Sequence, residues 1–143
     1  MLFAKKERRI TRILVVEDEP LVAFDTEHFL SGEGFEIVGT VDTVAEALAA
    51  IEADADIHLV LVDVNLSDGS GVAVAEAAAA RGVRVFFVTG SCPSEARSLA
   101  VGCLTKPYPQ RDLLNAIAAL ERVLDGKPPK RLPASFTLFA QPV

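Results

Sequence analysis

The chain has 143 residues, half of them apolar, and a formal net charge of −6, a length that predicts a single domain. No apolar run approaches the ~20 residues of a membrane-spanning helix, and the basic N-terminus lacks the apolar stretch of a signal peptide, which argues against membrane insertion. We therefore expect a cytoplasmic protein. Its two cysteines give no disulfide framework, and we expect reduced thiols.

The charge is unevenly distributed along the chain. Residues 13–125 hold six basic and nineteen acidic side chains, a net charge of −13, so we expect no direct binding to nucleic acid. Residues 1–10 form a basic arm, and five bases precede the first apolar run: Lys5, Lys6, Arg8, Arg9 and Arg12. We expect a solvated arm, with contact to an acidic partner as the alternative.

Short apolar runs bounded by turn residues predict five strands. In chain order they cover residues 11–16, 36–40, 58–62, 84–89 and 103–105. Helical patterns lie after each of them and begin at Pro20, Thr43, Gly71, Pro93 and Gln110. Strict alternation of strand and helix predicts an α/β fold: a doubly wound parallel sheet with helices on both faces.

Two of these helices carry distinct local signals. Thr43 and Glu46 have the spacing of a capping box, and the helix that they open places Val44, Leu48 and Ile51 on one face. The helix after Pro93 can hardly exceed two turns, because a glycine follows at position 102.

Residues 126–143 form a proline-containing tail outside the domain that we place at residues 11–125. The tail begins with a segment that cannot continue a helix and then carries Phe136, Leu138 and Phe139. A mobile end and an apolar cluster that docks, on its own domain or on a partner, are alternatives of equal standing. No DNA-binding or enzymatic output domain fits into these residues.

Chemically useful side chains follow four of the predicted strands. Glu17 and Asp18 follow the first strand, Asp63 the third and Thr89 the fourth, while Lys106 closes the fifth. Because carboxyl ends of parallel strands meet at one sheet edge, where ligands bind, these groups should lie together. Three adjacent carboxylates repel one another and need a cation; Mg²⁺ suits them because it takes oxygen ligands and brings phosphate oxygens with it. The hydroxyl and the ammonium then suit a phosphoryl group on Asp63.

This ordered set resembles the receiver domain of two-component response regulators, the CheY-like family, over about residues 11–125. The resemblance implies a flavodoxin-like, five-stranded sheet in the order 2-1-3-4-5. It also implies roles for single residues: Asp63 as phosphoacceptor, Glu17 and Asp18 as the acidic pair at the metal, the Asn65 backbone carbonyl as a further Mg²⁺ ligand. Thr89 resembles the switch hydroxyl, and Lys106, before Pro107, resembles the family's lysine. The residues implied to bind the phosphoryl group are Asn65, Thr89, Gly90 and Lys106.

The implied function is that of a stand-alone response regulator in a phosphorelay. A histidine kinase or a histidine phosphotransfer protein would donate the phosphoryl group to Asp63, with Mg²⁺ as cofactor, and a downstream protein would be the target. Such a domain is a phosphoacceptor with self-phosphorylation and slow autodephosphorylation, not an enzyme in the ordinary sense. The resemblance further implies a cis Lys106–Pro107 bond, and it leaves a homodimer open.

Other classes fit the motifs less well. A Mg²⁺-dependent small-molecule phosphatase of the haloacid dehalogenase type is the alternative function, but Asp63-Val64-Asn65 lacks that family's second acid. A flavodoxin-like FMN module needs a neutral phosphate loop where this chain has Glu17-Asp18-Glu19. A degenerate receiver that serves only as a docking surface would lack some site residues, and here all are present.

Two departures from the receiver pattern bear on how a signal would leave the site. Ser67 stands where receivers commonly have proline, and Cys103 stands where many have the aromatic residue that turns inward on activation. The run Phe87-Val88-Thr89-Gly90 resembles a receiver subset with Phe-x-Thr-Gly that lacks this aromatic. We therefore predict a readout through the ordering or displacement of residues 91–102. Cys103 is expected to act as a small buried hydrophobe, and a redox role for Cys92 is the minor alternative.

Overall fold

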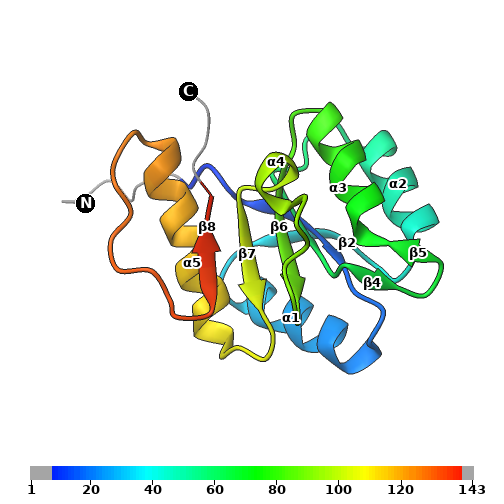
Figure 1. Ribbon diagram of the computed structural model, residues 1–143, viewed down its shortest axis with the longest axis horizontal. Helices are drawn as coiled ribbons and strands as arrows, with labels where there is room; N and C mark the ends of the chain where they lie inside the picture. The colour runs from blue at the N-terminus through cyan, green and yellow to red at the C-terminus, as the bar shows by residue number, and fades with distance from the viewer. Residues whose placement is uncertain (1–7, 140–143) are drawn as a thin grey trace.

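The computed structural model describes residues 8–139, in which one twisted sheet is covered on both faces by helices (Figure 1). The sheet has six strands in the order β2-β1-β3-β6-β7-β8. The first five are parallel: β2 (Glu36–Val41), β1 (Arg12–Val16), β3 (Leu59–Val62), β6 (Arg84–Thr89) and β7 (Gly102–Thr105). The doubly wound α/β fold and its parallel strand order are thus confirmed.

The sixth strand corrects the prediction of a five-stranded sheet. β8 (Phe136–Leu138) comes from the tail and pairs antiparallel with β7. Three residues between irregular segments show no strand periodicity, so this strand depends on the unpaired backbone groups that β7 offers at the sheet edge. A second, two-stranded hairpin, β4 (Asn65–Leu66) and β5 (Gly69–Ser70), was not predicted either.

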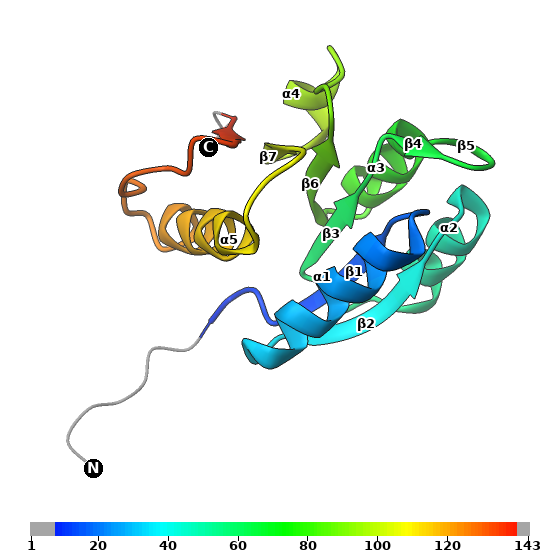
Figure 2. The ribbon, with the colours of Figure 1, turned by 90° about the horizontal axis from the view of Figure 1, so that it is seen from below.

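The helices divide into two groups, one on each face of the sheet (Figures 1 and 2). On one face lie α1 (Pro20–Gly32) and α5 (Gln110–Leu124). On the other lie α2 (Val44–Ala53), α3 (Gly71–Ala80) and the single turn α4 (Ala96–Leu99). Within residues 8–139, no helix has the length and apolar character that a bilayer span requires.

The central strand β3 is buried on both faces, as its unbroken apolar run predicted. Leu59 and Leu61 pack in the core under α1 and α5, whereas Val60 and Val62 pack in the core under α2 and α3. Fully burying an aliphatic side chain stabilises a fold by ~1.5–3 kcal/mol, so these four residues fix the strand firmly. Asp63 directly follows this strand, so the position of its backbone is fixed as well.

The start of α2 forms as predicted, but its buried face differs. The Thr43 hydroxyl oxygen accepts a hydrogen bond from the Glu46 backbone N–H at 3.1 Å, which confirms Thr43 as the N-cap, and the Glu46 carboxylate contacts the Thr43 hydroxyl at 3.1 Å. The side chain of Ala47 is fully buried, and that of Leu48 is 37% exposed, so Leu48 does not share the core face with Ile51. Ala47 and Ile51 instead share the core cluster on this side of the sheet.

In the described part of the basic arm, Arg8 and Arg9 are exposed, and Ile10 packs against the domain. Ile10 is buried, and its N–H donates to the Glu121 carboxylate at 2.8 Å. The Arg9 side chain lies 2.8 Å from Asp125, also at the end of α5. The burial of Ile10 brings the neighbouring arginine to the acidic end of that helix. The two lysines of the arm lie outside the described residues.

The tail, as far as residue 139, docks on its own domain. The Phe136 ring is buried against Phe86, with 5.1 Å between ring centroids. The Thr105 N–H donates to the Ser135 carbonyl at 2.8 Å, and the Phe139 N–H donates to the Val101 carbonyl at 3.0 Å. Backbone pairing and ring burial together hold β8 along the edge of β7.

Candidate functional site

Asp63 lies immediately after β3, at the carboxyl edge of the sheet. Its side chain is largely buried, and its backbone N–H donates to the Val16 carbonyl of the neighbouring strand at 3.1 Å. The Asn65 N–H donates to Asp63 Oδ1 at 3.0 Å. Strand pairing and this local turn therefore aim the carboxylate at the open side of the edge.

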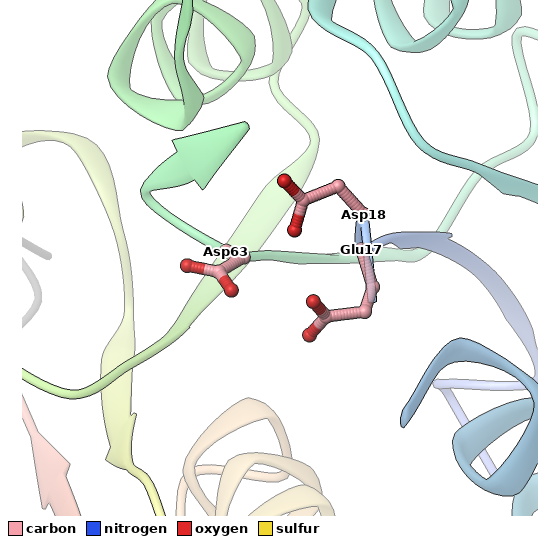
Figure 3. A group of neighbouring side chains, drawn as sticks. All are labelled: Glu17, Asp18 and Asp63. Carbon is pink, nitrogen blue, oxygen red and sulfur yellow. The ribbon is translucent and has the colours of Figure 1, made fainter. Parts of the chain in front are cut away.

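Glu17 and Asp18 follow β1, which is the direct neighbour of β3. One carboxylate oxygen from each of Glu17, Asp18 and Asp63 lies within 4.8 Å of the others, and Figure 3 shows the three side chains grouped at the two strand ends. Burial raises the pKa of Glu17 above its ordinary value, although the hydrogen bond from Lys106 opposes the change. The residues predicted to form an acidic cluster are brought together.

Lys106 connects two of these carboxylates. Its Nζ lies 2.7 Å from Glu17 Oε1 and 2.8 Å from Asp63 Oδ2. Partial burial alone would lower the pKa of this ammonium, but its hydrogen bonds to Asp63 and Glu17 raise the pKa above the ordinary lysine value. The side chain therefore stays charged, and it neutralises part of the cluster's repulsion. The Lys106–Pro107 bond is cis, as expected.

Thr89 ends β6, and its side chain is almost fully buried. Its carbonyl accepts the Lys106 N–H at 2.9 Å, and its hydroxyl oxygen lies 3.4 Å from the Ser91 nitrogen. Gly90 is exposed, and a Cβ added there would meet no atom within 4 Å. Thr89 is thus followed by an exposed glycine, and its backbone is hydrogen-bonded to that of Lys106.

Asn65 and Asp68 lie in the β4–β5 hairpin that follows Asp63. The Asp68 carboxylate accepts hydrogen bonds from the Val44 N–H at 2.7 Å and the Ala45 N–H at 3.1 Å. These bonds to the start of α2 lower the pKa of Asp68. Asp68 is therefore a cap for a helix distant in sequence, which fixes the loop that carries Asn65.

Gly71 is a positioning residue that the sequence did not reveal. A Cβ at this position would overlap the Asp63 carbonyl oxygen and come within 2.9 Å of the Val62 side chain. The Gly71 N–H also donates to the Val64 carbonyl at 2.7 Å. Only a residue without a side chain lets α3 begin this close to Asp63. Its sequence signal, a glycine opening an alanine-rich helix, indicated only a helix start.

The cysteines correct another expectation. Cys92 and Cys103 form a disulfide with 6.4 Å between their Cα atoms, so Cys103 is buried but is not a free thiol. Spacing alone cannot pair two cysteines. The pairing follows from the fold, in which the loop after β6 turns back over β7.

The donor set fits Mg²⁺. Three carboxylates from two adjacent strand ends supply only oxygen, the ligand that this ion prefers, and Asp18 is only partly buried. Within residues 8–139, no protein group donates a hydrogen bond to the Asp18 carboxylate, whereas the other two carboxylates each accept one from Lys106. Asp18 is thus the carboxylate whose charge is least compensated by the protein.

A model of the family described as response regulator receiver domain matches residues 13–118. The chain belongs to the response regulator receiver family. No curated protein matches it. Among solved structures, a CheY-like receiver domain from Methanospirillum hungatei JF-1 is 29% identical with a TM-score of 0.73, covering 82% of this chain and 98% of that one.

Two further solved structures are similar to this receiver. SdrG from Sphingomonas melonis Fr1 is 42% identical with a TM-score of 0.64, covering 78% of this chain and 96% of that one. The response regulator PhyR from Brucella abortus is 32% identical with a TM-score of 0.68, covering 84% of this chain but only 51% of that one. These likenesses support the receiver fold and family, and they do not support the haloacid dehalogenase alternative.

Proposed function

We propose that this receiver accepts a phosphoryl group on Asp63 from a histidine kinase or a histidine phosphotransfer protein in the cytoplasm, and signals by binding a downstream protein. The observation that carries the proposal is the position of Asp63. Its carboxylate is buried at the sheet edge, contacts Lys106, and belongs to a cluster of three acids. A functional site needs several such convergent groups.

The transfer itself is an in-line displacement. An Asp63 carboxylate oxygen forms a bond to phosphorus, the bond between phosphorus and the donor's imidazole nitrogen breaks, and the imidazole takes back the electron pair. Catalysis of phosphoryl transfer is mostly positioning and charge stabilisation. Mg²⁺ held by Asp18, Asp63 and the Asn65 carbonyl, with Glu17 nearby, would supply positive charge for the phosphoryl oxygens.

The remaining groups act on the transferred phosphoryl group. Lys106 already lies 2.8 Å from Asp63 Oδ2, so its ammonium can follow the charge from the carboxylate to a phosphoryl oxygen. The Thr89 hydroxyl and the Gly90 N–H would donate to the other oxygens. Later attack by water on phosphorus would give the slow autodephosphorylation expected of this class.

Incubation with acetyl phosphate and Mg²⁺, followed by intact mass measurement, tests the proposal. We expect one added phosphoryl group on the wild-type protein, none on Asp63→Asn, and wild-type uptake for Asp42→Asn, which removes an exposed carboxylate from another loop. Uptake by Asp63→Asn equal to that of the wild type would contradict the assignment.

An apolar face beside the site suits the phosphoryl donor. In α1, the side chains of Leu21 and Phe24 are 79% and 65% exposed, and both belong to the helix that follows Glu17 and Asp18. A hollow next to them, between α1 and the segment after Lys106, is lined by Thr26 and Tyr108 among others. A donor protein could bury these side chains while it presents its phosphohistidine to Asp63.

Replacing Phe24 distinguishes the docking of a donor protein from the phosphoryl transfer itself. We expect Phe24→Ala to slow phosphotransfer from the cognate kinase or phosphotransfer protein while uptake from acetyl phosphate stays unchanged, because the small donor needs no docking face. Leu48→Ala, at another exposed apolar residue, is the matched control. If Phe24→Ala accepts phosphoryl groups from the protein donor as fast as wild type, the donor does not bind this face.

A further inference from the structure

The disulfide is placed between the two parts of the site that handle the phosphoryl group. Cys92 follows Thr89 by three residues, and Cys103 precedes Lys106 by three residues. Strand β6, which leads to the loop with Cys92, already pairs with β7, which carries Cys103: Phe87 pairs with Cys103 and Thr89 with Thr105 in register. The covalent bond therefore fastens the start of the loop, directly after Gly90, to the middle of β7.

Besides that bond, the segment between the two cysteines is held by a small set of tertiary contacts. Its only helix, α4, has four residues, and Glu95, the residue before it, makes no capping hydrogen bond through its side chain. The segment's buried apolar anchors are Ala96, Ala100 and Val101. The Val101 N–H donates to the Val85 carbonyl at 2.9 Å, and the Val101 carbonyl accepts the Phe139 N–H at 3.0 Å. The Arg97 guanidinium lies 5.2 Å from the centroid of the Phe139 ring. A helix this short does not persist on its own, so the segment's order depends on such tertiary contacts and on the disulfide.

The two sulfur atoms differ in accessibility. Cys92 is exposed in the loop after β6, whereas Cys103 is fully buried in β7. These are the only cysteines in the chain, so no alternative intramolecular pairing competes. Disulfides in cytosolic proteins, when present, usually serve catalysis or redox sensing.

We propose that Cys92 and Cys103 are a reversible oxidation site for hydroperoxides, and that their disulfide locks the loop between Thr89 and Lys106. The oxidation site rests on the cysteine pair alone. The effect of the disulfide on the loop's response to phosphorylation rests on the proposed function. In the reduced protein the loop is free to reorder when the Gly90 N–H and Thr89 bind phosphoryl oxygens, and in the oxidised protein it is not.

The oxidation balances with a hydroperoxide as oxidant. The Cys92 thiolate attacks the terminal peroxide oxygen, the O–O bond breaks, and an alcohol or water leaves with Cys92 as a sulfenic acid. The Cys103 thiol then attacks that sulfur, the S–O bond breaks and water leaves. Two thiols are oxidised, one peroxide bond is reduced, and a dithiol reductant reverses the change by thiol–disulfide exchange.

The first experiment tests the cysteine pair without any phosphoryl donor. The reduced wild-type protein is treated with stoichiometric hydrogen peroxide and alkylated with iodoacetamide under denaturing conditions. Its intact mass is then measured by mass spectrometry. We expect a monomer that has lost two hydrogens and takes up no alkyl group, and two alkyl groups after renewed reduction. Cys92→Ser should retain one alkylatable or singly oxidised thiol. A reduced protein that forms only mixed dimers or higher sulfur oxides overturns the proposal.

The second experiment tests the lock. Amide hydrogen exchange is measured for the reduced and oxidised wild type and for Cys92→Ser, each with and without beryllofluoride as a phosphoryl mimic in Mg²⁺. We expect beryllofluoride to change exchange in residues 90–102 of the reduced protein and of Cys92→Ser, and this difference to be lost in the oxidised protein. Equal responses in both redox states overturn the lock.

The two proposals can fail separately. If acetyl phosphate adds no phosphoryl group to reduced wild type or to Cys92→Ser, the proposed function fails, and the lock fails with it. The mass and alkylation result would still establish the oxidation site in that case. If phosphorylation occurs but peroxide makes no intramolecular disulfide, only the redox proposal fails.

Discussion

At the scale of single residues, Gly71 shows how closely the fold is built around Asp63. A Cβ at position 71 would overlap the Asp63 carbonyl oxygen, so Gly71→Ala must shift either α3 or the end of β3. We expect a loss of ~1–3 kcal/mol in the free energy of unfolding, the usual cost of overpacking. The measurement is urea denaturation, with Gly32→Ala as control because a Cβ there meets nothing within 4 Å. Equal stability of the two variants would contradict the close approach.

Lys106 is the residue whose removal leaves charge uncompensated. Its ammonium contacts both Glu17 and Asp63, which are largely buried, so Lys106→Met leaves two carboxylates facing each other. Breaking a buried pair from one side costs ~3–5 kcal/mol, and the partial exposure of Lys106 makes us expect less than that.

The test for Lys106→Met is its melting temperature in EDTA and in millimolar Mg²⁺. We expect the deficit in EDTA to shrink in Mg²⁺, because a bound cation replaces part of the lost positive charge. Lys127→Met, at an exposed lysine, should melt like wild type under both conditions. A deficit that is the same with and without the ion would mean that packing, not charge, accounts for it.

At the scale of elements, the Asp68 carboxylate connects the β4–β5 hairpin to α2, and the stability that its hydrogen bonds contribute depends on pH. The hydrogen bonds from the Val44 and Ala45 N–H groups lower the pKa of Asp68 in the folded protein. A group with a depressed folded pKa contributes stability above its unfolded pKa, near 3.8, and loses this contribution as the pH falls through the folded value.

We therefore expect Asp68→Asn to be less stable than wild type at pH 7, with a gap that narrows steadily as the pH drops below about 4.5. Urea denaturation between pH 7 and pH 3 measures it. Glu76→Gln, in the exposed part of α3, is the control for removing a carboxylate. If the stability difference between wild type and Asp68→Asn stays constant down to pH 3, the negative charge of Asp68 is not the source of its stabilising effect.

The strand β8 is held by a ring that fits over a glycine. A Cβ at Gly102 would lie 2.5 Å from atoms of the Phe136 ring. We expect Phe136→Ala to lose ~3–5 kcal/mol, as for other buried phenylalanines, and Gly102→Ala to cost clearly less in the Phe136→Ala background than in wild type. A double-mutant cycle by urea denaturation measures this coupling. Additive costs would show that the tail strand is not packed on this edge.

Elements with a local sequence pattern could be predicted, whereas those that depend on contacts between distant segments could not. The β3 run and the acid that ends it are local patterns, and parallel pairing alone then brings Asp63 to Glu17 and Asp18. The hairpin at Asn65, the strand at Phe136 and the disulfide depend instead on contacts between distant segments. A three-residue strand or a pair of cysteines carries no periodicity, so only the assembled sheet reveals what it pairs with.

At the scale of the whole molecule, we predict that metal binding at the acidic edge stabilises the fold. Three carboxylates lie within 4.8 Å of one another, and an ion that binds only the folded state stabilises it by mass action. At a Mg²⁺ concentration ten times the dissociation constant, the gain is roughly 1.4 kcal/mol. Asp18→Ala should abolish the Mg²⁺-dependent rise in melting temperature, and a persistent rise would remove Asp18 from the metal site.

The central claim is that Asp63 carries the phosphoryl group, and chemical mapping of the acyl phosphate tests it most directly. Protein incubated with acetyl phosphate and Mg²⁺ is reduced with borohydride, which converts a phosphorylated aspartate to homoserine, and its peptides are sequenced by mass spectrometry. We expect homoserine at position 63 alone, with Asp18 and Asp68 unchanged. Homoserine at another acidic residue, with Asp63 intact, would contradict the proposed function.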